Sequence, residues 1–478
     1  MPTSLRRDFR LTKIVCTLGP ASSTWEQIEA MAEAGMNVAR LNFSHGNHAS
    51  HGQAIQKIKG LNKKLNHPIA ILLDTQGPEI RTGEIAGSLD LKVDEIFTFT
   101  VRPGLDPEEH SVHVNYADLA RDLKAGDRIT VDNGAINLQV LEIRDGRLEC
   151  RVIDGGKLGS RKHVNLPGVR VNLPSITEKD RADIRFGLEH DVDFIALSFV
   201  RSPDDIFEAR KLVAEKPGSK ARIIAKIENR EGLDNFDAIL AEADGIMVAR
   251  GDLGVEIDLE ELPVVQRRIV RACAVAGKPV IVATHLLESM IASPMPTRAE
   301  VTDVANAVYE QADAVMLSGE TAAGKHPSKC IEVLDRITRR IEKEPGLGFH
   351  QARAASGARE ELARSACRLA DTLGAPAIVV MTRRGLLAQL VASYRPERAV
   401  IYAFTNMSSI RRKLWLLRSV VPFVIDFSES DPEKTIRTAF ARMKRNNRLH
   451  AGDSVVVVSD TAAGDERIPS IQVRTVAG

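Results

Sequence analysis

The 478-residue sequence has few aromatic residues, few cysteines and no long uncharged apolar run. Aromatic side chains make up 4% of the chain, so the cores have to be aliphatic, which fits layered α/β folds. No segment approaches the roughly 18 apolar residues of a membrane-spanning helix. Residues 1–13 are charged but lack the apolar stretch of a secretory signal. The sequence therefore predicts no membrane partner.

The five cysteines are scattered and odd in number, with no Cys-x-x-Cys pair (Cys16, Cys150, Cys273, Cys330 and Cys367). This pattern is typical of buried thiols in a reducing cytosol rather than of a disulfide framework or a zinc site. An excess of one charge is also missing, because 65 Lys and Arg residues balance 64 Asp and Glu residues. Without a basic field the sequence predicts no nucleic-acid partner, and we expect a cytoplasmic protein.

Eight apolar runs have the character of buried parallel strands and alternate with helix-like segments. The runs are residues 13–19, 36–46, 68–75, 192–200, 222–228, 244–252, 278–286 and 313–320. Eight βα units favour a closed (β/α)8 TIM barrel, with a doubly wound open sheet as the alternative. Capping-box spacing marks two helix starts, at Ser23 with Glu26 and at Thr297 with Glu300.

The stretch between the third and fourth runs is far longer than an ordinary βα loop. Residues 76–168 hold short alternating runs and glycine turns, which predict an inserted antiparallel β domain with one helical turn near residues 116–123. After a connector, strand-like runs at 376–382, 398–405, 423–427, 453–460 and 471–476 predict a separate α/β open-sheet domain. The expected domains are 1–75 and 169–344 for the barrel, 76–168 for the insertion and 345–478 for the C-terminal domain.

The stretch from Arg222 to Glu256 is predicted to be one βαβ unit, with a single helix over 232–243, and each of its strands ends in charge. Lys226 and Glu228 lie two apart and project to the same side, and Asp252 arrives at the end of the next strand. A structural ion pair, which is the alternative, needs only one carboxylate. Two carboxylates suit a divalent metal with oxygen ligands.

A parallel barrel places the carboxyl ends of all its strands on one face, so polar residues at those ends can be pooled. The pooled set is Arg40, Asn42, Ser44, Asp74, Thr75, Arg81, Lys226, Glu228, Asp252, Thr284, Ser318 and Glu320. Its cations suit phosphoryl oxygens, its paired acids suit Mg²⁺, and its other oxygen donors suit a hard monovalent cation. The sequence has no GxxxxGK[ST] loop, so any nucleotide is bound without a P-loop.

Nine motifs, in chain order and on the strand ends already chosen, resemble those of pyruvate kinase. They are TKIVCTLGPAS, GMNVARLNFSHG, LDTQGPEIRTG, GSRKHVNLPG, AKIENREG, IMVARGDLGVE, ATHLLESM, PTRAEVTDVANAV and MLSGETAAGKHP. The resemblance implies a TIM barrel, a β-barrel-like lid inserted after the third strand and a C-terminal α/β effector domain. It also implies phosphoryl transfer from phosphoenolpyruvate to ADP, giving pyruvate and ATP in the last step of glycolysis, by a homotetramer.

Carried over residue by residue, the resemblance implies that Arg40 and Lys226 hold the transferring phosphoryl group. Glu228 and Asp252 would bind Mg²⁺ or Mn²⁺. Gly251 would lie beside the substrate carboxylate, and Thr284 would also touch the substrate. The remaining implied roles are K⁺ binding by Asn42, Ser44, Asp74 and Thr75, and contact with ATP by Arg81 and Lys162. We also expect a water relay that protonates the enolpyruvate near Thr284, Ser318 and Glu320.

Several positions depart from the family pattern beside the site. Gln76 stands where many members have lysine, and His163 replaces the usual glycine after Lys162. His285 and the leucine after it replace a common Gln-Met pair. These changes bear on tuning more than on the reaction itself. Glu79 matches members that depend on K⁺, whereas lysine there accompanies independence, so we expect K⁺ dependence.

The C-terminal domain carries the weakest part of the resemblance. Members that bind fructose 1,6-bisphosphate have a loop resembling T-[RK]-S-G-x-[ST]. The corresponding loop here lacks two of its hydroxyls and is Thr382-Arg383-Arg384-Gly385-Leu386-Leu387. A non-allosteric domain, or another sugar phosphate or a nucleotide as effector, is therefore expected ahead of fructose 1,6-bisphosphate.

Two other functions compete with phosphoryl transfer to ADP. Metal-dependent phosphoenolpyruvate or pyruvate lyase and mutase barrels share a Glu and Asp metal pair, but they lack the inserted lid, the monovalent-cation residues and Lys162. A catalytically silent barrel kept as a regulatory protein is the second rival. Every catalytic position that can be mapped is filled in this sequence, which disfavours it.

Overall fold

The computed structural model describes residues 9–101, 110–132, 134–169, 171–428, 430–463 and 466–477. Eight parallel strands close into a barrel in the order β1-β16-β15-β14-β13-β12-β3-β2. They are β1 (Lys13–Leu18), β2 (Val38–Asn42), β3 (Ala70–Asp74), β12 (Phe194–Leu197), β13 (Arg222–Ile227), β14 (Gly245–Ala249), β15 (Val280–Ala283) and β16 (Ala314–Leu317). The predicted TIM barrel is confirmed, and the open-sheet alternative is wrong.

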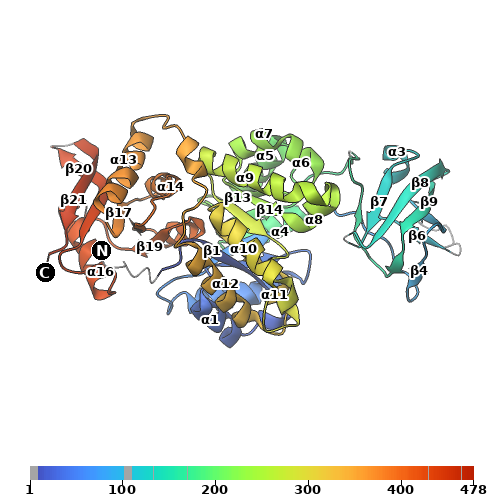
Figure 1. The fold of residues 1–478 in the computed structure, drawn as a ribbon, viewed down its shortest axis with the longest axis horizontal. Helices are drawn as coiled ribbons and strands as arrows, with labels where there is room; N and C mark the ends of the chain where they lie inside the picture. Colours follow the sequence, from blue (N-terminus) through green and yellow to red (C-terminus); the bar gives the residue numbers. More distant parts are fainter. Residues whose placement is uncertain are drawn as a thin grey trace.

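Helices surround the barrel and bury their apolar faces against its strands (Figure 1). They are α1 (Trp25–Ala34), α2 (His48–Leu61), α4 (Glu178–Glu189), α5 (Pro203–Glu215), α6 (Arg230–Asp234), α7 (Phe236–Glu242), α8 (Arg250–Glu256), α9 (Leu262–Ala276), α10 (Arg298–Tyr309), α11 (Gly319–Ala322) and α12 (Pro327–Ile341). Short 3-10 turns are η1 (Pro20–Ser22), η2 (Leu259–Glu261), η3 (Glu288–Ile291), η4 (Phe349–Ala352) and η5 (Leu414–Leu416). A second, inner cluster that includes Leu72, Phe194 and Met247 fills the barrel, so the barrel is a packed core.

Helix α1 begins one residue later than its predicted capping box. Thr24, not Ser23, is the N-cap, because its hydroxyl accepts the Gln27 N–H at 3.2 Å while the Gln27 side chain accepts the Thr24 N–H at 3.1 Å. Both candidate pairs have the same spacing, so the sequence alone does not choose between them. The predicted box of Thr297 with Glu300 is confirmed at the start of α10.

The βαβ unit of residues 222–256 differs from the prediction in two places. The expected single helix over 232–243 is two short helices, α6 and α7, which meet at Asn235. The second strand, expected to run to Asp252, ends at Ala249, and α8 begins at Arg250. Asp252 therefore lies in the first turn of a helix, where the backbone N–H groups favour a carboxylate.

The inserted domain is β-rich, as predicted. Its elements are β4 (Leu89–Leu91), β5 (Ile96–Thr100), β6 (Ser111–His113), α3 (Leu119–Asp122), β7 (Arg128–Val131), β8 (Ile136–Arg144), β9 (Arg147–Asp154), β10 (Gly156–Leu158) and β11 (Val164–Asn165). Among the described residues they form one six-stranded sheet, β11-β7-β8-β9-β5-β6, and the pair β10-β4, not a closed barrel. Pairing is antiparallel except between β5 and β6.

The C-terminal domain is a separate open sheet in the order β19-β18-β17-β20-β21. Its elements are α13 (Ala358–Leu373), β17 (Ala377–Met381), α14 (Leu386–Ser393), β18 (Val400–Thr405), α15 (Ser408–Lys413), β19 (Val420–Val424), α16 (Pro432–Arg445), β20 (Ser454–Ala463) and β21 (Glu466–Thr475). The third strand begins three residues before the predicted run 423–427, because buried Val420 and Val421 pair with β18. The exact limits of the three domains stay predictions.

The lid and the C-terminal domain lie at opposite ends of the barrel (Figure 1). The lid leaves after β3, at the carboxyl end. The C-terminal domain contacts the amino ends of the strands: Lys13 Nζ donates to the Val420 carbonyl at 2.8 Å, and Arg395 pairs with Asp313 at 2.5 Å. Leu416 belongs to the inner cluster and so closes the amino end of the barrel. No helix in the ranges above is long and apolar enough to cross a lipid bilayer.

Candidate active site

Lys226 is the centre of a buried polar cluster at the carboxyl ends of the strands. Its ammonium lies 2.9 Å from Glu228 Oε1 and 3.0 Å from Asp74 Oδ1, and it donates to Ser198 Oγ at 2.7 Å. Burial acts to lower the pKa of Lys226, but the Asp74 and Glu228 carboxylates outweigh it and raise the pKa above its ordinary value. The ammonium is therefore a permanent positive charge in a nearly water-free position.

Arg40 adds a second cation to this cluster. Its Nε lies 2.5 Å from Asp74 Oδ2, and its Nη1 donates to Thr17 Oγ1 at 2.9 Å. Although burial opposes the shift, Arg40 and Lys226 together lower the pKa of the Asp74 carboxyl, so this acid is ionised. One carboxylate thus holds both predicted phosphoryl-binding cations.

Glu228 and Asp252 are the predicted divalent-metal ligands. Burial, opposed by Lys226 and reinforced by the charge of Asp252, raises the pKa of Glu228 to about 7. Its Oε2 accepts the Phe199 N–H at 2.7 Å, and the Asp252 side chain is 32% exposed. In the part of the chain that the structure describes, no three His, Cys, Asp or Glu side chains form a ready-made metal cage. Two carboxylates fit a hard ion that completes its shell with substrate oxygens and water.

The predicted monovalent-cation residues occupy two adjacent strand ends. Asn42 is the register partner of Asp74, and the Ser44 N–H donates to Asn42 Oδ1 at 3.2 Å. Thr75 follows Asp74, and its Oγ1 accepts the Ser198 N–H at 3.0 Å. The structure therefore brings Asn42, Ser44, Asp74 and Thr75 together. Their oxygen donors fit a hard monovalent cation, with Asp74 supplying the charge.

Thr284 stands in a strained conformation beside the site. It is β-branched yet has φ of +66°, in the left-handed region that such residues avoid. Its hydroxyl accepts the Gly251 N–H at 2.7 Å. The buried Arg250 guanidinium donates to the Thr284 carbonyl at 2.5 Å and the Ala283 carbonyl at 3.1 Å. Asp303 holds the same guanidinium at 2.6 Å. Arg250 thus fixes the strained segment against α8.

Ser318 and Glu320, the predicted relay residues, differ in their hydrogen bonding. Glu320 is fully buried, and its two oxygens accept the N–H groups of Leu287 at 3.1 Å and Ser318 at 2.7 Å. Burial raises the pKa of its carboxyl. Ser318 Oγ is buried and has no hydrogen-bond partner among the described residues. Glu320 therefore holds the loop after β15 through its backbone hydrogen bonds. Of these two predicted relay residues, Ser318 is the one whose side chain can still bond to water or substrate.

The two segments that join the lid to the barrel, here called the lid root, carry the predicted nucleotide-binding residues Arg81 and Lys162. Arg81 Nε donates to Glu79 Oε2 at 2.7 Å, and Lys162 Nζ lies 2.7 Å from Asp132 in the lid. Arg81 and His163 form an isolated β-bridge, which places the two cations on adjacent chain segments. Gln76 also contacts Glu79, with its amide donating at 3.2 Å.

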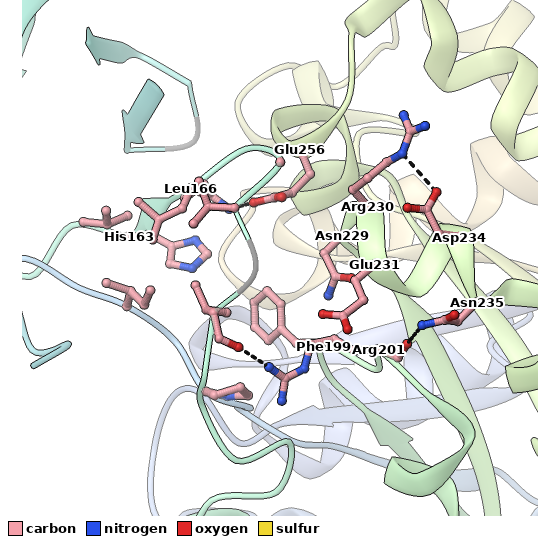
Figure 2. Close-up of a pocket in the computed structure, with 17 residues that line it drawn as sticks. His163, Leu166, Phe199, Arg201, Asn229, Arg230, Glu231, Asp234, Asn235 and Glu256 are labelled. Atoms are coloured by element: carbon pink, nitrogen blue, oxygen red, sulfur yellow. Dashed lines mark hydrogen bonds and ion pairs between the residues drawn. The ribbon is translucent and has the colours of Figure 1, made fainter. Parts of the chain in front are cut away.

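His163 brings the segment that joins the lid to the barrel close to Asp252, one of the two predicted metal ligands. Its Nδ1 lies 3.8 Å from Asp252 Oδ1, and burial lowers the pKa of its imidazole although the Asp252 charge opposes the shift. A pocket of about 240 Å³ lies directly behind it, between the lid root and the barrel (Figure 2). His163 and Leu166 lie on one side of the pocket with Glu256 next to Leu166, and Asn229 and Glu231 lie on the other side (Figure 2). The lid is therefore seated next to the cluster.

The predicted effector loop lies in the C-terminal domain, away from the barrel site. Thr382 Oγ1 accepts the Gly385 N–H at 3.0 Å and so shapes the turn before α14. A pocket of about 440 Å³ beside this loop is lined by leucines and by the cationic residues Arg359, Arg383 and Arg384. Its composition suits an anion with an apolar body.

Sequence reasoning missed two residues that the structure places in the cluster. Ser198 bonds to Lys226 and Thr75, and Arg250 fixes Thr284. Ser198 is the polar residue at the carboxyl end of the run 192–200, the same signal that selected the other pooled residues. Arg250 directly follows its strand, but nothing in the sequence shows that its side chain turns back toward β15.

Two family models match the chain: pyruvate kinase, barrel domain, over residues 9–331, and pyruvate kinase, alpha/beta domain, over residues 360–468. Pyruvate kinase from Dictyostelium discoideum is 43% identical, covering 99% of this chain and 96% of the relative. Pyruvate kinase from Clostridium acetobutylicum is 40% identical, covering 97% and 99%. A crystal structure of a pyruvate kinase from Cryptosporidium parvum is 38% identical with a TM-score of 0.92, covering 98% and 96%.

The barrel, the lid and the cluster of cations and carboxylates define a phosphotransferase. The matches span the barrel with its insertion, the C-terminal domain and nearly the whole chain. The chain belongs to the pyruvate kinase family. This membership excludes the lyase or mutase barrel that the metal carboxylates alone would allow.

Proposed function

We propose that this chain transfers the phosphoryl group of phosphoenolpyruvate to ADP through the cluster centred on Lys226, giving pyruvate and ATP. The observation that carries this assignment is the meeting of Arg40, Lys226, Asp74 and Glu228 at the carboxyl ends of neighbouring strands. Arg40 contacts Asp74, Asp74 contacts Lys226, and Lys226 contacts Glu228, so two cations for phosphoryl oxygens and a carboxylate for a divalent metal belong to one connected cluster.

Arg40 and Lys226 supply fixed positive charge to the transferring group. Phosphoryl transfer passes through a loose transition state, which is stabilised mainly by positioning and by preorganised charge. The raised pKa keeps Lys226 protonated throughout the reaction. Its ammonium can therefore offset charge first on the phosphoryl oxygens and then on the departing enolate oxygen.

Glu228 and Asp252 would hold Mg²⁺ or Mn²⁺. The bound ion supplies Lewis-acid stabilisation of the same oxygens. Gly251, next to Asp252, lies beside the substrate carboxylate, and Thr284 contacts the substrate from the end of β15. The Gly251 N–H is already held by the Thr284 hydroxyl, so these two residues form one wall of the site.

The enolpyruvate is protonated at carbon after transfer. We assign the route to water ordered near Thr284 and the Ser318 hydroxyl, because that hydroxyl is buried and has no partner among the described residues. Glu320 supports this route from behind through its bonds to backbone N–H groups.

Asn42, Ser44, Asp74 and Thr75 would hold K⁺, and Glu79 makes the activity depend on it. Arg81 and Lys162 contact the nucleotide phosphates from the lid root. Their present partners, Glu79 and Asp132, hold them on adjacent segments until the nucleotide arrives. Closure of the lid over the nucleotide excludes water from the reaction.

The C-terminal domain binds an anionic effector at Thr382, Arg383, Arg384 and Gly385, and the assembled enzyme is a cytoplasmic homotetramer. The three arginines around the pocket support the charge of this ligand. The missing hydroxyls of the loop favour a sugar phosphate or nucleotide other than fructose 1,6-bisphosphate.

Pyruvate formation from phosphoenolpyruvate and ADP tests this function, with Mg²⁺ or Mn²⁺ and with or without K⁺. Turnover that needs both kinds of ion supports the whole assignment. Turnover indifferent to K⁺ keeps the reaction and removes the role given to Glu79. Sedimentation of the purified protein tests the tetramer separately.

A further inference from the structure

We propose that Ser198 is a positioning residue that links the monovalent-cation residues to Lys226, so that a bound monovalent cation sets the place of the Lys226 ammonium. The inference rests on the proposed K⁺ role of Asp74 and Thr75. It adds a side chain between that site and the phosphoryl-binding lysine.

Ser198 makes hydrogen bonds in both directions. Its hydroxyl accepts from Lys226 Nζ at 2.7 Å and donates to the Thr75 carbonyl at 2.6 Å. Its backbone N–H donates to Thr75 Oγ1 at 3.0 Å. The residue is 1% exposed, so water does not substitute for these partners. Ser198 is thus the direct bridge between Thr75 and Lys226.

The hydroxyl of Ser198 has one hydrogen and two acceptors within reach. The Thr75 carbonyl is at 2.6 Å, and Asp74 Oδ1, which also contacts Lys226 at 3.0 Å, is at 3.4 Å. A cation bound to either oxygen competes with the hydroxyl hydrogen and with the ammonium. Occupation of the monovalent site therefore changes which oxygen Ser198 bonds, and with it the balance of forces on Lys226.

The backbone around Ser198 is held by hydrogen bonds and by close packing. Phe199 has φ of +52°, and its N–H is held by Glu228 at 2.7 Å. Gly77 packs against the corner from the other side with φ of +74°, where an added Cβ would lie 2.9 Å from Ser198 Cβ and 2.7 Å from Phe199 Cδ2. Asp180 accepts the Gly77 N–H at 3.1 Å. Because the backbone at Ser198 and Phe199 is held in this way, we expect the Lys226 side chain to change position when a monovalent cation binds.

The test is calorimetric binding of phosphoenolpyruvate with Mg²⁺, in K⁺ or in tetramethylammonium, for the wild type, S198A and S198C. Cysteine is close to serine in size but bonds weakly. We expect K⁺ to tighten phosphoenolpyruvate binding by the wild type. In both variants this tightening should be about tenfold smaller, which is the scale of one hydrogen bond to a charged group. S393A is the matched control, because Ser393 is also buried and donates to the Leu390 carbonyl at 2.7 Å.

Thallium NMR of the same proteins separates coupling from loss of the site. We expect Tl⁺ to bind S198A and S198C almost as it binds the wild type. A wild type whose phosphoenolpyruvate binding ignores K⁺ overturns the K⁺ role itself. A full K⁺ effect in folded S198A and S198C overturns the coupling through Ser198. So does loss of Tl⁺ binding in both variants, or an equal loss of the K⁺ effect in S393A. Thermal melts identify a misfolded S198A, and S198C then decides.

Discussion

The ammonium of Lys226 lies 3.0 Å from the carboxylate of Asp74, although strand β12 separates β13 from β3 in the barrel. The second oxygen of that carboxylate is 2.5 Å from Arg40. One fully buried acid therefore contacts both cations proposed for the phosphoryl group. In the proposed function, a monovalent cation that shares Asp74 would weaken this hold and free the two side chains for substrate.

Replacing Asp74 by asparagine keeps the shape of the side chain and removes its charge. We expect D74N to lose activation by K⁺ and to be destabilised by about 3 kcal/mol, because buried Arg40 loses its carboxylate partner and buried Lys226 keeps only Glu228. Urea unfolding and rates in K⁺ or tetramethylammonium measure both effects. D191N, at an acid whose side chain is 65% exposed, is the control. Unchanged K⁺ activation in D74N would contradict the shared-carboxylate account.

Glu79 controls the need for K⁺ in this account. Its carboxylate is 2.7 Å from Arg81 and accepts from Gln76 at 3.2 Å. Lysine at this position accompanies K⁺ independence in the family that the sequence resembles, so we expect E79K to work almost equally well with and without K⁺. The measurement is the ratio of the two kcat values. E84K, at an exposed lid acid, should keep the wild-type ratio, and an unchanged ratio in E79K removes the role given to Glu79.

Arg250 keeps Thr284 in its left-handed conformation. Such a conformation costs about 1–3 kcal/mol in a β-branched residue and persists only when its surroundings hold it. Lysine cannot reproduce the forked donation to Ala283 and Thr284. We expect R250K to lower kcat/KM about tenfold to a hundredfold, while R185K, at an exposed arginine, changes nothing. Wild-type kinetics in R250K would show that Thr284 does not need this support.

We expect His350, near the interface between the barrel and the C-terminal domain, to make the protein less stable at acidic pH. Burial, reinforced by the charges of Arg395 and Arg418, lowers the pKa of this imidazole to about 4 from an ordinary value near 6.5. The unfolded chain then binds more protons between these values, so stability falls as the pH drops below about 6.5. We expect H350Q to be more stable than the wild type at pH 5, by about 1–3 kcal/mol, and not at pH 8.

Thermal melts at the two pH values check the His350 prediction. H450Q, at an exposed histidine, is the control and should not change the difference between them. An H350Q melt that shifts by the same amount at both pH values would mean that proton uptake by His350 plays no part in acid unfolding.

The sequence predicts what depends on periodicity and on strand ends. The eight barrel strands and the meeting of Lys226, Glu228 and Asp74 follow from apolar runs that end in polar residues, since a closed parallel barrel leaves those ends no other place. Details that depend on competing local interactions were not predictable. Thr24 and Ser23 offer the same capping spacing, and tertiary packing decides between them.

Contacts between side chains that are far apart in the sequence were also not predictable. That Arg250 turns back to Ala283 and Thr284, or that Ser198 bonds to Lys226, depends on which strands are neighbours after closure. The pairing of Arg395 with Asp313 depends on how two domains dock. No local pattern around any of these residues contains that information, so only the folded barrel shows them.

The most direct test compares the wild type with K226M for pyruvate formation from phosphoenolpyruvate and ADP, with Mg²⁺ and K⁺ present. Methionine keeps the length of the lysine stem and removes its charge. We expect turnover by the wild type and at least about a thousandfold loss in K226M, the scale of losing preorganised charge in the transition state. No turnover by the wild type under any ion condition, even with sugar-phosphate or nucleotide effectors added, would contradict it, as would an equally active K226M.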